Sequence, residues 1–157
     1  MQHVKWVFSG IGVLAITLIC TFFAPTKCNS ERSSLKLSAR VLIVDHDENC
    51  KLTRMLINAG WVFTKNRTDV ENLDAPDILE AQVIFVNAEA VGASFFNDQG
   101  YGLAAALKER YPDKKIVNYG VDGHPNIILK TERGVDAYLP KNAESYEFIK
   151  LLDSFFK

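Results

Sequence analysis

Short apolar runs recur along the chain after residue 39, and stretches with a helical spacing of apolar residues separate them. The apolar runs predict five strands, at Val41–Val44, Trp61–Thr64, Val83–Val86, Ile116–Tyr119 and Ala137–Leu139. A continuous apolar run is typical of a strand that is buried on both faces of a parallel sheet. The stretches between the runs predict five helices, at Glu48–Ala59, Asp69–Leu79, Tyr101–Tyr111, Pro125–Arg133 and Ala143–Phe156.

Strands that alternate with helices in this way predict an α/β fold with a doubly wound, five-stranded parallel sheet. Gly60 and Gly134 end two of the helices, and Pro76 makes the second helix short or broken. Ligands of such folds bind at the carboxyl ends of the strands. The residues that directly follow each strand are therefore the first candidates for chemistry.

The amino-terminal part of the chain has a different pattern. Trp6–Ala24 is 19 residues without a charge. A helix of that length, at about 1.5 Å per residue, nearly matches the roughly 30 Å hydrocarbon core of a bilayer. We therefore predict a transmembrane helix at residues 6–24. The chain then divides into an anchor at residues 1–25, a polar and Ser-rich flexible tether at 26–38, and a domain at 39–157.

A cleaved signal peptide, followed by export of the domain, is the alternative for this segment. Lys5 would form the charged n-region, but the apolar run is longer than the usual h-region of about 7 to 15 residues. A cut after Ala24 would leave the bulky Phe22 near the cleavage site and Pro25 directly behind it. These residues fit cleavage poorly, so a retained anchor is the favoured interpretation.

Basic residues give the expected orientation of this anchor. Lys27, Arg32, Lys36 and Arg40 follow the apolar run, whereas Lys5 and the amino terminus precede it. The positive-inside rule then places the domain in the cytoplasm.

Composition narrows the possibilities further. The 157 residues are 48% hydrophobic and 24% charged, which suits one folded domain and excludes a disordered or collagen-like chain. The formal net charge is -1, so no basic excess predicts nucleic-acid binding. Cys50 is the one cysteine of the predicted domain, so an internal disulfide is not expected.

The candidate residues for chemistry follow four of the five predicted strands. They are Asp45, His46 and Asp47 after the first strand, Asn87 after the third, Gly120 after the fourth and Lys141 after the fifth. This order resembles the receiver domain of bacterial two-component response regulators. Two segments carry the resemblance: RVLIVDHDENCKLTRMLINAGW, from Arg40 to Trp61, and GVDAYLPKN, from Gly134 to Asn142. The resemblance implies a flavodoxin-like fold of the receiver type for nearly all of the chain after residue 38.

In that family an acidic pair after the first strand binds magnesium, and an Asp after the third strand is phosphorylated. A hydroxyl side chain after the fourth strand and a Lys after the fifth contact the phosphoryl group. Asp45 and Lys141 match this set, but His46 stands for the second acid, Asn87 for the phospho-acceptor and Gly120 for the hydroxyl residue. Because a neutral amide is not a usable nucleophile for an acyl phosphate, the resemblance implies a degenerate receiver, or pseudo-receiver.

Two further positions follow from the resemblance. Tyr138 matches the family's fifth-strand aromatic residue, whose side chain reports the switch state. Magnesium would have Asp45 as its one matched acid and would bind weakly, because the imidazole of His46 suits that ion poorly. Asp47 would restore the second acid only if the loop shifts, which would leave a receiver domain with residual metal-dependent switching. No other cofactor is expected.

Two other interpretations of these residues stay open. In a structural one, Asp45 and Asp47 cap the first helix and Lys141 pairs with Asp45. In an enzymatic one, VLIVDHDE resembles the Asp-x-Asp motif of haloacid dehalogenase-like phosphohydrolases, with Asp45 as nucleophile and Asp47 as acid/base. That family needs a second, paired acidic motif, and Asp122 and Asp136 are the only candidates for it.

The favoured function is a membrane-anchored pseudo-receiver that acts in signalling as a phosphorylation-independent protein-interaction module, without enzymatic activity. The surface of the last two helices, together with Tyr138, is expected to bind a protein partner.

Overall fold

The computed structural model describes residues 34–89, 91–121 and 134–157. The predicted transmembrane helix at 6–24 and the predicted helix at 125–133 lie outside these residues. Within them, no helix combines the length and the apolar character that a membrane crossing requires.

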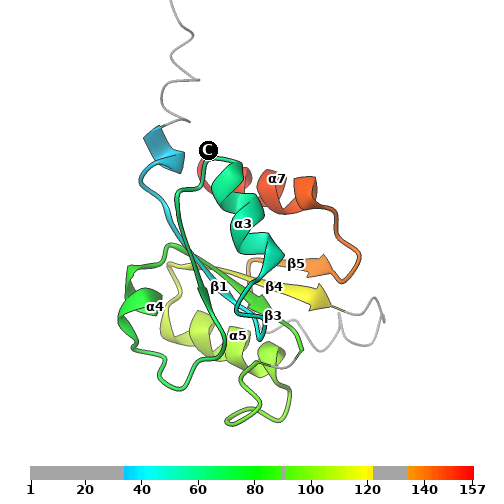
Figure 1. Cartoon of the computed structure of the whole chain (residues 1–157). Helices are drawn as coiled ribbons and strands as arrows, with labels where there is room; N and C mark the ends of the chain where they lie inside the picture. Colours follow the sequence, from blue (N-terminus) through cyan, green and yellow to red (C-terminus); the bar gives the residue numbers. More distant parts are fainter. Residues whose placement is uncertain (1–33, 90, 122–133) are drawn as a thin grey trace, which may run out of the picture.

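Five parallel strands form one sheet in the order β2-β1-β3-β4-β5 (Figure 1). The strands are β1 (Arg40–Val44), β2 (Phe63–Arg67), β3 (Val83–Asn87), β4 (Lys115–Val121) and β5 (Ala137–Pro140). The helices that connect them in the described ranges are α3 (Lys51–Asn58), α4 (Pro76–Glu80), α5 (Gly100–Arg110) and α7 (Ser145–Phe155). This arrangement confirms the predicted α/β fold with a five-stranded parallel sheet.

Helices cover both faces of the sheet, with α3 and α7 on one face and α4 and α5 on the other (Figure 1). Residues of β1 alternate between the two cores: Val41 and Ile43 pack under α3 and α7, whereas Leu42 and Val44 pack under α4 and α5. Burial on both faces is why β1 and β3 are apolar along their length. It also holds the carboxyl ends of these two strands side by side in the middle of the sheet.

The strand β2 begins later than predicted. Trp61, where the strand was expected to start, is buried in the loop before β2, and its carbonyl oxygen accepts the Thr64 hydroxyl at 2.7 Å. The strand itself lies at the edge of the sheet and pairs with β1. An edge strand needs no continuous apolar run, so the pattern pointed to the buried loop residue instead of the strand.

The starts of α3 and α4 differ most from the prediction. α3 begins three residues later, because a turn occupies the residues before it. In this turn the N–H of Cys50 donates to the Asp47 carbonyl at 3.1 Å, and the N–H of Asn49 donates to Asp47 Oδ1 at 2.9 Å. α4 begins at Pro76 and is not interrupted by it, since a proline in the first turn of a helix needs no N–H partner.

The start of α5 lies directly against the end of β3. A Cβ atom at Gly100 would be 1.8 Å from the carbonyl oxygen of Asn87, so only glycine permits this approach. The buried amide of Asn118 in β4 donates to the Gly100 carbonyl at 3.0 Å. Together these contacts fix α5 beside the carboxyl end of β3.

Residues 34–38, predicted as the end of a flexible tether, pack on the domain. Lys36 Nζ forms an ion pair with Asp153 of α7 at 3.2 Å and lies 5.3 Å from the centre of the Trp61 ring. The same Nζ donates to the carbonyl oxygen of Ala59 at 3.4 Å. The packed part of the chain therefore includes the residues just before β1.

Candidate functional site

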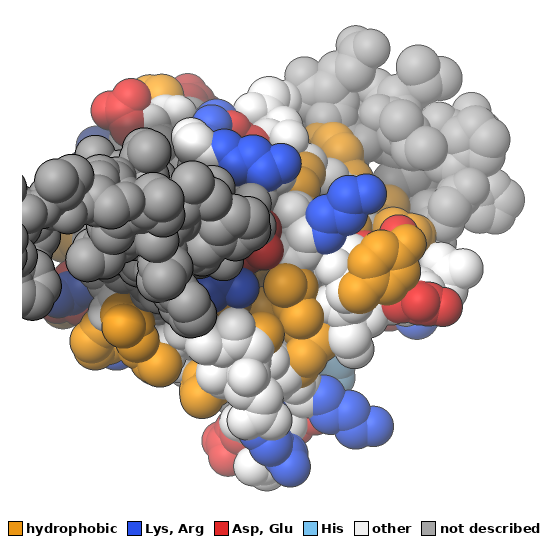
Figure 2. Space-filling view, turned by 90° about the horizontal axis from the view of Figure 1, so that it is seen from above, with side chains coloured by type: hydrophobic (Ala, Val, Ile, Leu, Met, Phe, Trp, Pro, Cys, Tyr) orange, Lys and Arg blue, Asp and Glu red, His pale blue; other side chains and the backbone are white. Residues whose placement is uncertain are grey.

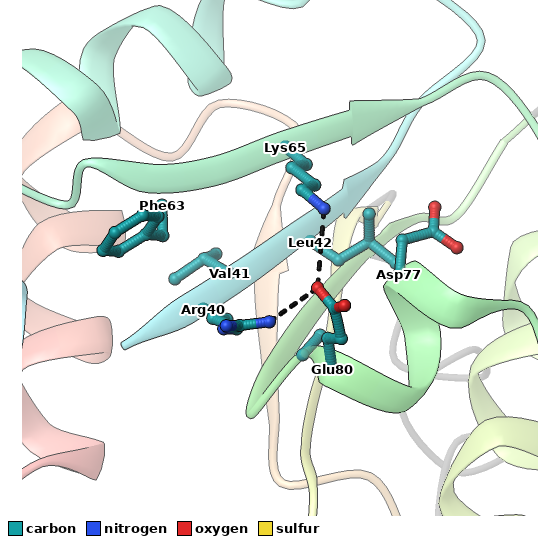
Figure 3. A pocket seen from close by; sticks show the side chains of 8 residues that line it. Arg40, Val41, Leu42, Phe63, Lys65, Asp77 and Glu80 are labelled. Atoms are coloured by element: carbon teal, nitrogen blue, oxygen red, sulfur yellow. Dashed lines mark ion pairs between the residues drawn. The ribbon is translucent and has the colours of Figure 1, made fainter. Parts of the chain in front are cut away.

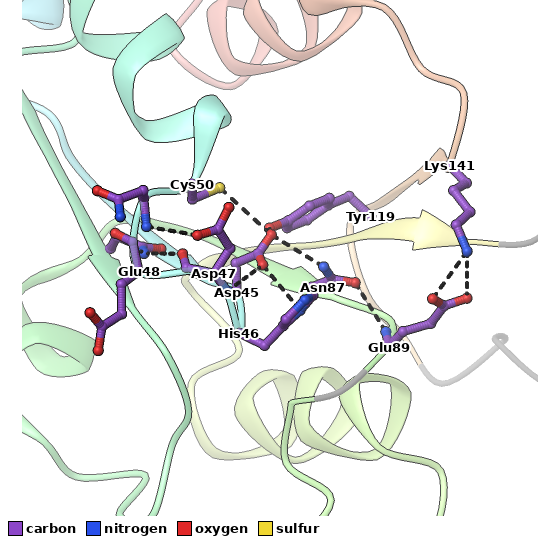
Figure 4. Close-up of polar contacts among 11 residues, drawn as sticks. Asp45, His46, Asp47, Glu48, Cys50, Asn87, Glu89, Tyr119 and Lys141 are labelled. Carbon is purple, nitrogen blue, oxygen red and sulfur yellow. Dashed lines mark hydrogen bonds and ion pairs between the residues drawn. The ribbon is translucent and has the colours of Figure 1, made fainter.

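Asp45 stands directly after β1, and its side chain is nearly enclosed by hydrogen-bond donors. The residue is 7% exposed. Oδ2 accepts hydrogen bonds from the Tyr119 hydroxyl, from Asn87 Nδ2 at 3.2 Å and from the Cys50 thiol at 3.6 Å (Figure 4). Donors from β4, from β3 and from the residue before α3 thus converge on one oxygen. We refer to Asp45, Tyr119, Asn87 and Cys50 as the Asp45 cluster.

The second oxygen of Asp45 is also occupied. Oδ1 accepts the backbone N–H of Asp47 at 3.0 Å and lies 3.3 Å from Nδ1 of His46. The His46 side chain is otherwise largely exposed, so it covers the outer side of the carboxylate. Both oxygens of Asp45 are therefore engaged by groups of the protein itself.

The electrostatics of the Asp45 cluster follow from this arrangement. Burial alone would raise the pKa of Asp45, but the hydrogen bonds from Tyr119, Asp47 N–H, Asn87 and Cys50 outweigh burial and hold the pKa below its usual value. Burial, and then the hydrogen bond to Asp45, raise the pKa of Tyr119, and burial raises the pKa of Cys50. At neutral pH the Asp45 cluster consequently contains one carboxylate and three neutral donors.

Asn87, at the end of β3, uses both ends of its amide. Nδ2 donates to Asp45, and Oδ1 accepts the backbone N–H of Glu89 at 3.0 Å. These two bonds fix which way the amide faces. An Asp at this position would place a second carboxylate about 3 Å from Asp45 Oδ2, where two like charges repel. The neutral amide avoids this repulsion and also donates a hydrogen bond to Asp45.

The conformation of the backbone explains why residue 120 is a glycine, which the sequence did not reveal. Its φ is +74°, and the pairing of β4 with β5 shifts register between Tyr119 and Val121. A Cβ atom here would lie 2.9 Å from Asn87 Oδ1, so a side chain meets both backbone strain and a close contact. Gly120, which stands where the family has a hydroxyl residue, is thus a β-bulge glycine next to the Asp45 cluster.

Lys141 does not point to the Asp45 cluster. Its Nζ donates to both carboxylate oxygens of Glu89 at 3.1 Å, and Figure 4 shows the ammonium group directed to Glu89 and away from Asp45. The expected pairing of Lys141 with Asp45 is therefore wrong in this structure. The observed pair is largely exposed, and such pairs contribute about 0–1 kcal/mol to stability.

The remaining predicted site residues lie around the Asp45 cluster rather than in it. Asp47 is exposed, and its carboxylate accepts the Asn49 N–H within the turn before α3, so the loop does not bring it to Asp45 as a second acid. Tyr138 of β5 is partly buried. No group of three or more His, Cys, Asp or Glu residues in the described ranges is arranged to hold a metal ion. Magnesium needs several free oxygen ligands, and these residues do not offer them.

A separate pocket of about 370 Å³ lies at the other end of β1, between β2 and α4 (Figure 3). Phe63 and Leu42 form apolar parts of its wall. Glu80 forms ion pairs with Arg40 at 2.7 Å and with Lys65 at 3.6 Å, so two cations share one carboxylate at this pocket. It contains no residue of the Asp45 cluster.

Sequence reasoning missed three residues of this region. Cys50 was considered only as a cysteine without a disulfide partner in the domain, and its hydrogen bond to Asp45 was not predicted. Tyr119 was assigned only to the fourth strand, although a Tyr in a buried strand is a signal, because its hydroxyl needs a partner. Glu89 lies two residues after Asn87 and was not singled out. Which residues reach Asp45 and Lys141 depends on the bulge at Gly120 and on the turn after β3.

The sheet order, with polar residues gathered where its three middle strands end, defines the receiver-domain fold. Solved structures of this fold resemble the chain closely in backbone and weakly in sequence.

The receiver domain of NtrX from Brucella abortus is 18% identical with a TM-score of 0.58, and the match covers 74% of this chain and 97% of that one. The BeF3-activated receiver domain of DrrB, from Thermotoga maritima, is 20% identical with a TM-score of 0.58, over 74% of this chain and 96% of that one. A CheY-like receiver domain protein from Methanospirillum hungatei JF-1 is 16% identical with a TM-score of 0.57, over 75% and 93%.

The match to a longer NtrX chain, at 17% identity and a TM-score of 0.61, spans 27% of that protein. No protein-family model and no curated protein matches the sequence. These likenesses establish the fold, and the activity has to be argued from the residues.

Proposed function

We propose that this protein is a pseudo-receiver: a signalling module with a receiver fold that binds a protein partner without being phosphorylated. The observation that carries the proposal is the Asp45 cluster. An amide stands where a receiver would be phosphorylated, and both oxygens of the neighbouring carboxylate accept hydrogen bonds from neutral donors. Phosphorylation would need both a carboxylate nucleophile and a cation at this place.

The Asp45 cluster also connects to the proposed partner surface. The Tyr119 ring packs edge-on against Phe148 of α7, with ring centres 5.8 Å apart, while its hydroxyl donates to Asp45. The position of α7 is thereby tied to the cluster without a phosphoryl group. On the outer side of α7, Tyr146 is 59% exposed and adjoins Ile149 and Lys150. We infer that α7, with Tyr138 of the neighbouring strand, presents the partner surface in one fixed state.

The phosphohydrolase alternative finds little support in this geometry. A nucleophilic Asp45 would need an oxygen free to attack a phosphorus atom, but both of its oxygens accept hydrogen bonds. Asp47, the proposed acid/base, faces the turn before α3. Asp136, one of the two residues considered for a second acidic motif, pairs with Lys108 and Lys115 at the other end of the sheet.

We further propose that residues 6–24 anchor the protein in a membrane, with the domain on the cytoplasmic side. The support is the 19-residue uncharged run and the basic residues that follow it. The full-length chain is then expected in the membrane fraction at its unprocessed mass, and protease added outside intact cells should not cut the domain. A soluble form that starts at Pro25 or later would favour the signal-peptide interpretation.

Phosphorylation is tested on the purified full-length chain with acetyl phosphate and magnesium, followed by intact mass measurement. We expect no added phosphoryl group and no hydroxylamine-sensitive product, whereas a receiver domain that keeps its acceptor Asp should gain one in a parallel tube. A stoichiometric acyl phosphate on this chain would overturn the pseudo-receiver proposal. Turnover of a phosphomonoester that disappears in Asp45→Asn would support the phosphohydrolase instead.

A further inference from the structure

Exposed large apolar side chains gather at one edge of the domain. Eight such side chains are exposed in the described residues. Six of them precede strands or begin one, and we call these six the amino-edge group: Leu35, Leu37, Ile57, Val62, Phe63 and Leu79. Single exposed apolar residues are ordinary on protein surfaces, but several at one edge mark an interaction surface.

The topology puts these six residues at the same end of the sheet. In a parallel sheet all strands begin at one edge, and each connecting helix ends there. Leu35 and Leu37 precede β1, Ile57 is in the last turn of α3, and Leu79 is in the last turn of α4. Val62 and Phe63 lie at the start of β2, next to β1 through the pairing of Phe63 with Arg40. Figure 1 shows the turn before β1 beside the end of α3.

The other two exposed apolar side chains lie at the opposite edge. Phe95 is in the loop between β3 and α5, and Tyr146 is in the first turn of α7. Both are more exposed than Val62, at 62% and 59% against 44%. They therefore serve as matched controls for any property that depends on which edge of the domain is involved.

Five charged residues near the amino-edge group form ion pairs. Arg40 and Lys65 share Glu80 (Figure 3), and Lys36 pairs with Asp153. Figure 2, which views the domain from the side of α3 and α7, shows hydrophobic side chains interspersed with Lys, Arg, Asp and Glu side chains. A binding surface here therefore offers apolar side chains beside ion pairs in which three cations meet two carboxylates.

The length of chain before residue 34 indicates what this surface contacts. Nine residues separate Ala24, the end of the uncharged run, from Ser34, the first described residue. Nine extended residues reach at most about 30 Å. If residues 6–24 span a bilayer, the amino edge is the part of the domain that is held beside it.

We propose that the amino-edge group inserts into the interface of the lipid bilayer, so that the domain is docked on the membrane and not merely tethered to it. Apolar side chains at such interfaces reach about 5–10 Å into the boundary of headgroups and acyl chains. Phe95 and the carboxyl edge, with the Asp45 cluster, then face away from the membrane. This inference rests on the proposed membrane anchor.

The test uses the full-length chain in phosphatidylcholine nanodiscs. Cys20→Ala and Cys28→Ser remove the other cysteines, and Cys50 is buried, so an introduced cysteine carries the fluorescent label alone. With doxyl-labelled lipid in the disc, a label at Val62→Cys or Leu37→Cys should lose severalfold more fluorescence than a label at Phe95→Cys. Equal quenching at residues 62 and 95 would overturn the docking.

Charge substitutions provide the second arm. Leu37→Glu combined with Phe63→Glu should bring the quenching of a label at residue 62 down to the level of the Phe95 label. Phe95→Glu, at the opposite edge, should leave it unchanged. If neither the doxyl lipid nor an aqueous quencher reduces the fluorescence of the label at residue 62, a protein surface covers this edge, and the bilayer proposal is wrong.

Elution of the chain with the nanodiscs separates this inference from the anchor. A chain that does not elute with the discs overturns both the anchor and the docking. If the chain elutes with the discs but labels at residues 37 and 62 are quenched no more than a label at residue 95, only the docking is overturned. The phosphorylation experiment is independent of both outcomes.

Discussion

Replacing Asn87 by Asp should destabilise the domain and make its stability depend on pH. The substitution removes the amide that donates to Asp45 and places a carboxylate about 3 Å from Asp45 Oδ2. At an effective dielectric constant of about 20, two unit charges at that distance repel by about 5 kcal/mol. The pair can avoid this repulsion by binding one proton, and the shared proton then replaces the lost hydrogen bond.

The free energy needed to keep the pair protonated sets how much stability Asn87→Asp loses. An Asp in the unfolded chain has a pKa of about 3.9, and keeping it protonated at pH 7 costs about 1.4 kcal/mol per pH unit, or about 4 kcal/mol. This is less than the repulsion, so protonation is the expected response. Because the folded-state pKa of the pair is raised, the deficit against wild type is small below about pH 4 and grows by about 1.4 kcal/mol per unit as pH rises.

The assay is guanidinium unfolding of the full-length chain in mild detergent, followed by Trp61 fluorescence in a Trp6→Phe background. Asn87→Ala is the matched control: it loses a hydrogen bond to a charged group, about 1.5–3 kcal/mol, without adding a charge. Magnesium should restore part of the stability of Asn87→Asp and none in the wild type. An Asn87→Asp variant as stable as wild type at pH 7 without metal ions, or with a deficit that does not change with pH, would refute this reasoning.

Three further predictions concern the neighbours of Asn87. Tyr119→Phe should lower the free energy of unfolding by about 1.5–3 kcal/mol, because Asp45 loses a hydrogen bond. It should also raise the pKa of Asp45. Because stability is lost as pH falls through that pKa, the variant should unfold at a higher pH than wild type in an acid titration followed by circular dichroism. Gly120→Ser should lower the free energy of unfolding by about 1–3 kcal/mol, because the backbone has a positive φ and a Cβ would lie 2.9 Å from Asn87 Oδ1. A variant as stable as wild type in the same unfolding assay would contradict the bulge argument. Lys141→Ala should change stability by less than about 1 kcal/mol, because its exposed pair with Glu89 is weak, and a loss of several kcal/mol would mean that Lys141 neutralises Asp45 after all.

The buried strands could be predicted from sequence because their environment is uniform. β1 and β3 have helices on both faces, so four consecutive positions of each strand, 41–44 and 83–86, are apolar and the pattern is unambiguous. β2 could not be placed as well, because it is an edge strand and the most buried aromatic residue near it, Trp61, lies in a loop. Local hydrogen bonds of Asp47 decided where α3 begins, and an apolar period does not report them.

The candidate site shows the same division. The positions of Asp45 and Asn87 were predictable, because parallel strands bring their carboxyl ends together. The partner of Lys141 was not, since an exposed lysine can pair with any acid within reach of its flexible side chain. The place of Tyr119 in the Asp45 cluster depends on the local twist of β4 at Gly120, which is visible only in three dimensions.

The bulge at Gly120 also bears on how this sequence can change over time. A side chain at residue 120 would collide with the amide of Asn87, and a carboxylate at residue 87 would repel Asp45. Substitutions at such neighbouring positions are not additive, so the effect of each depends on which residue occupies the other. A mutational path that introduces both a carboxylate at residue 87 and a side chain at residue 120 therefore crosses a less stable intermediate whichever step comes first. Epistasis of this kind means that the substitutions accepted at residue 120 depend on the residue at position 87.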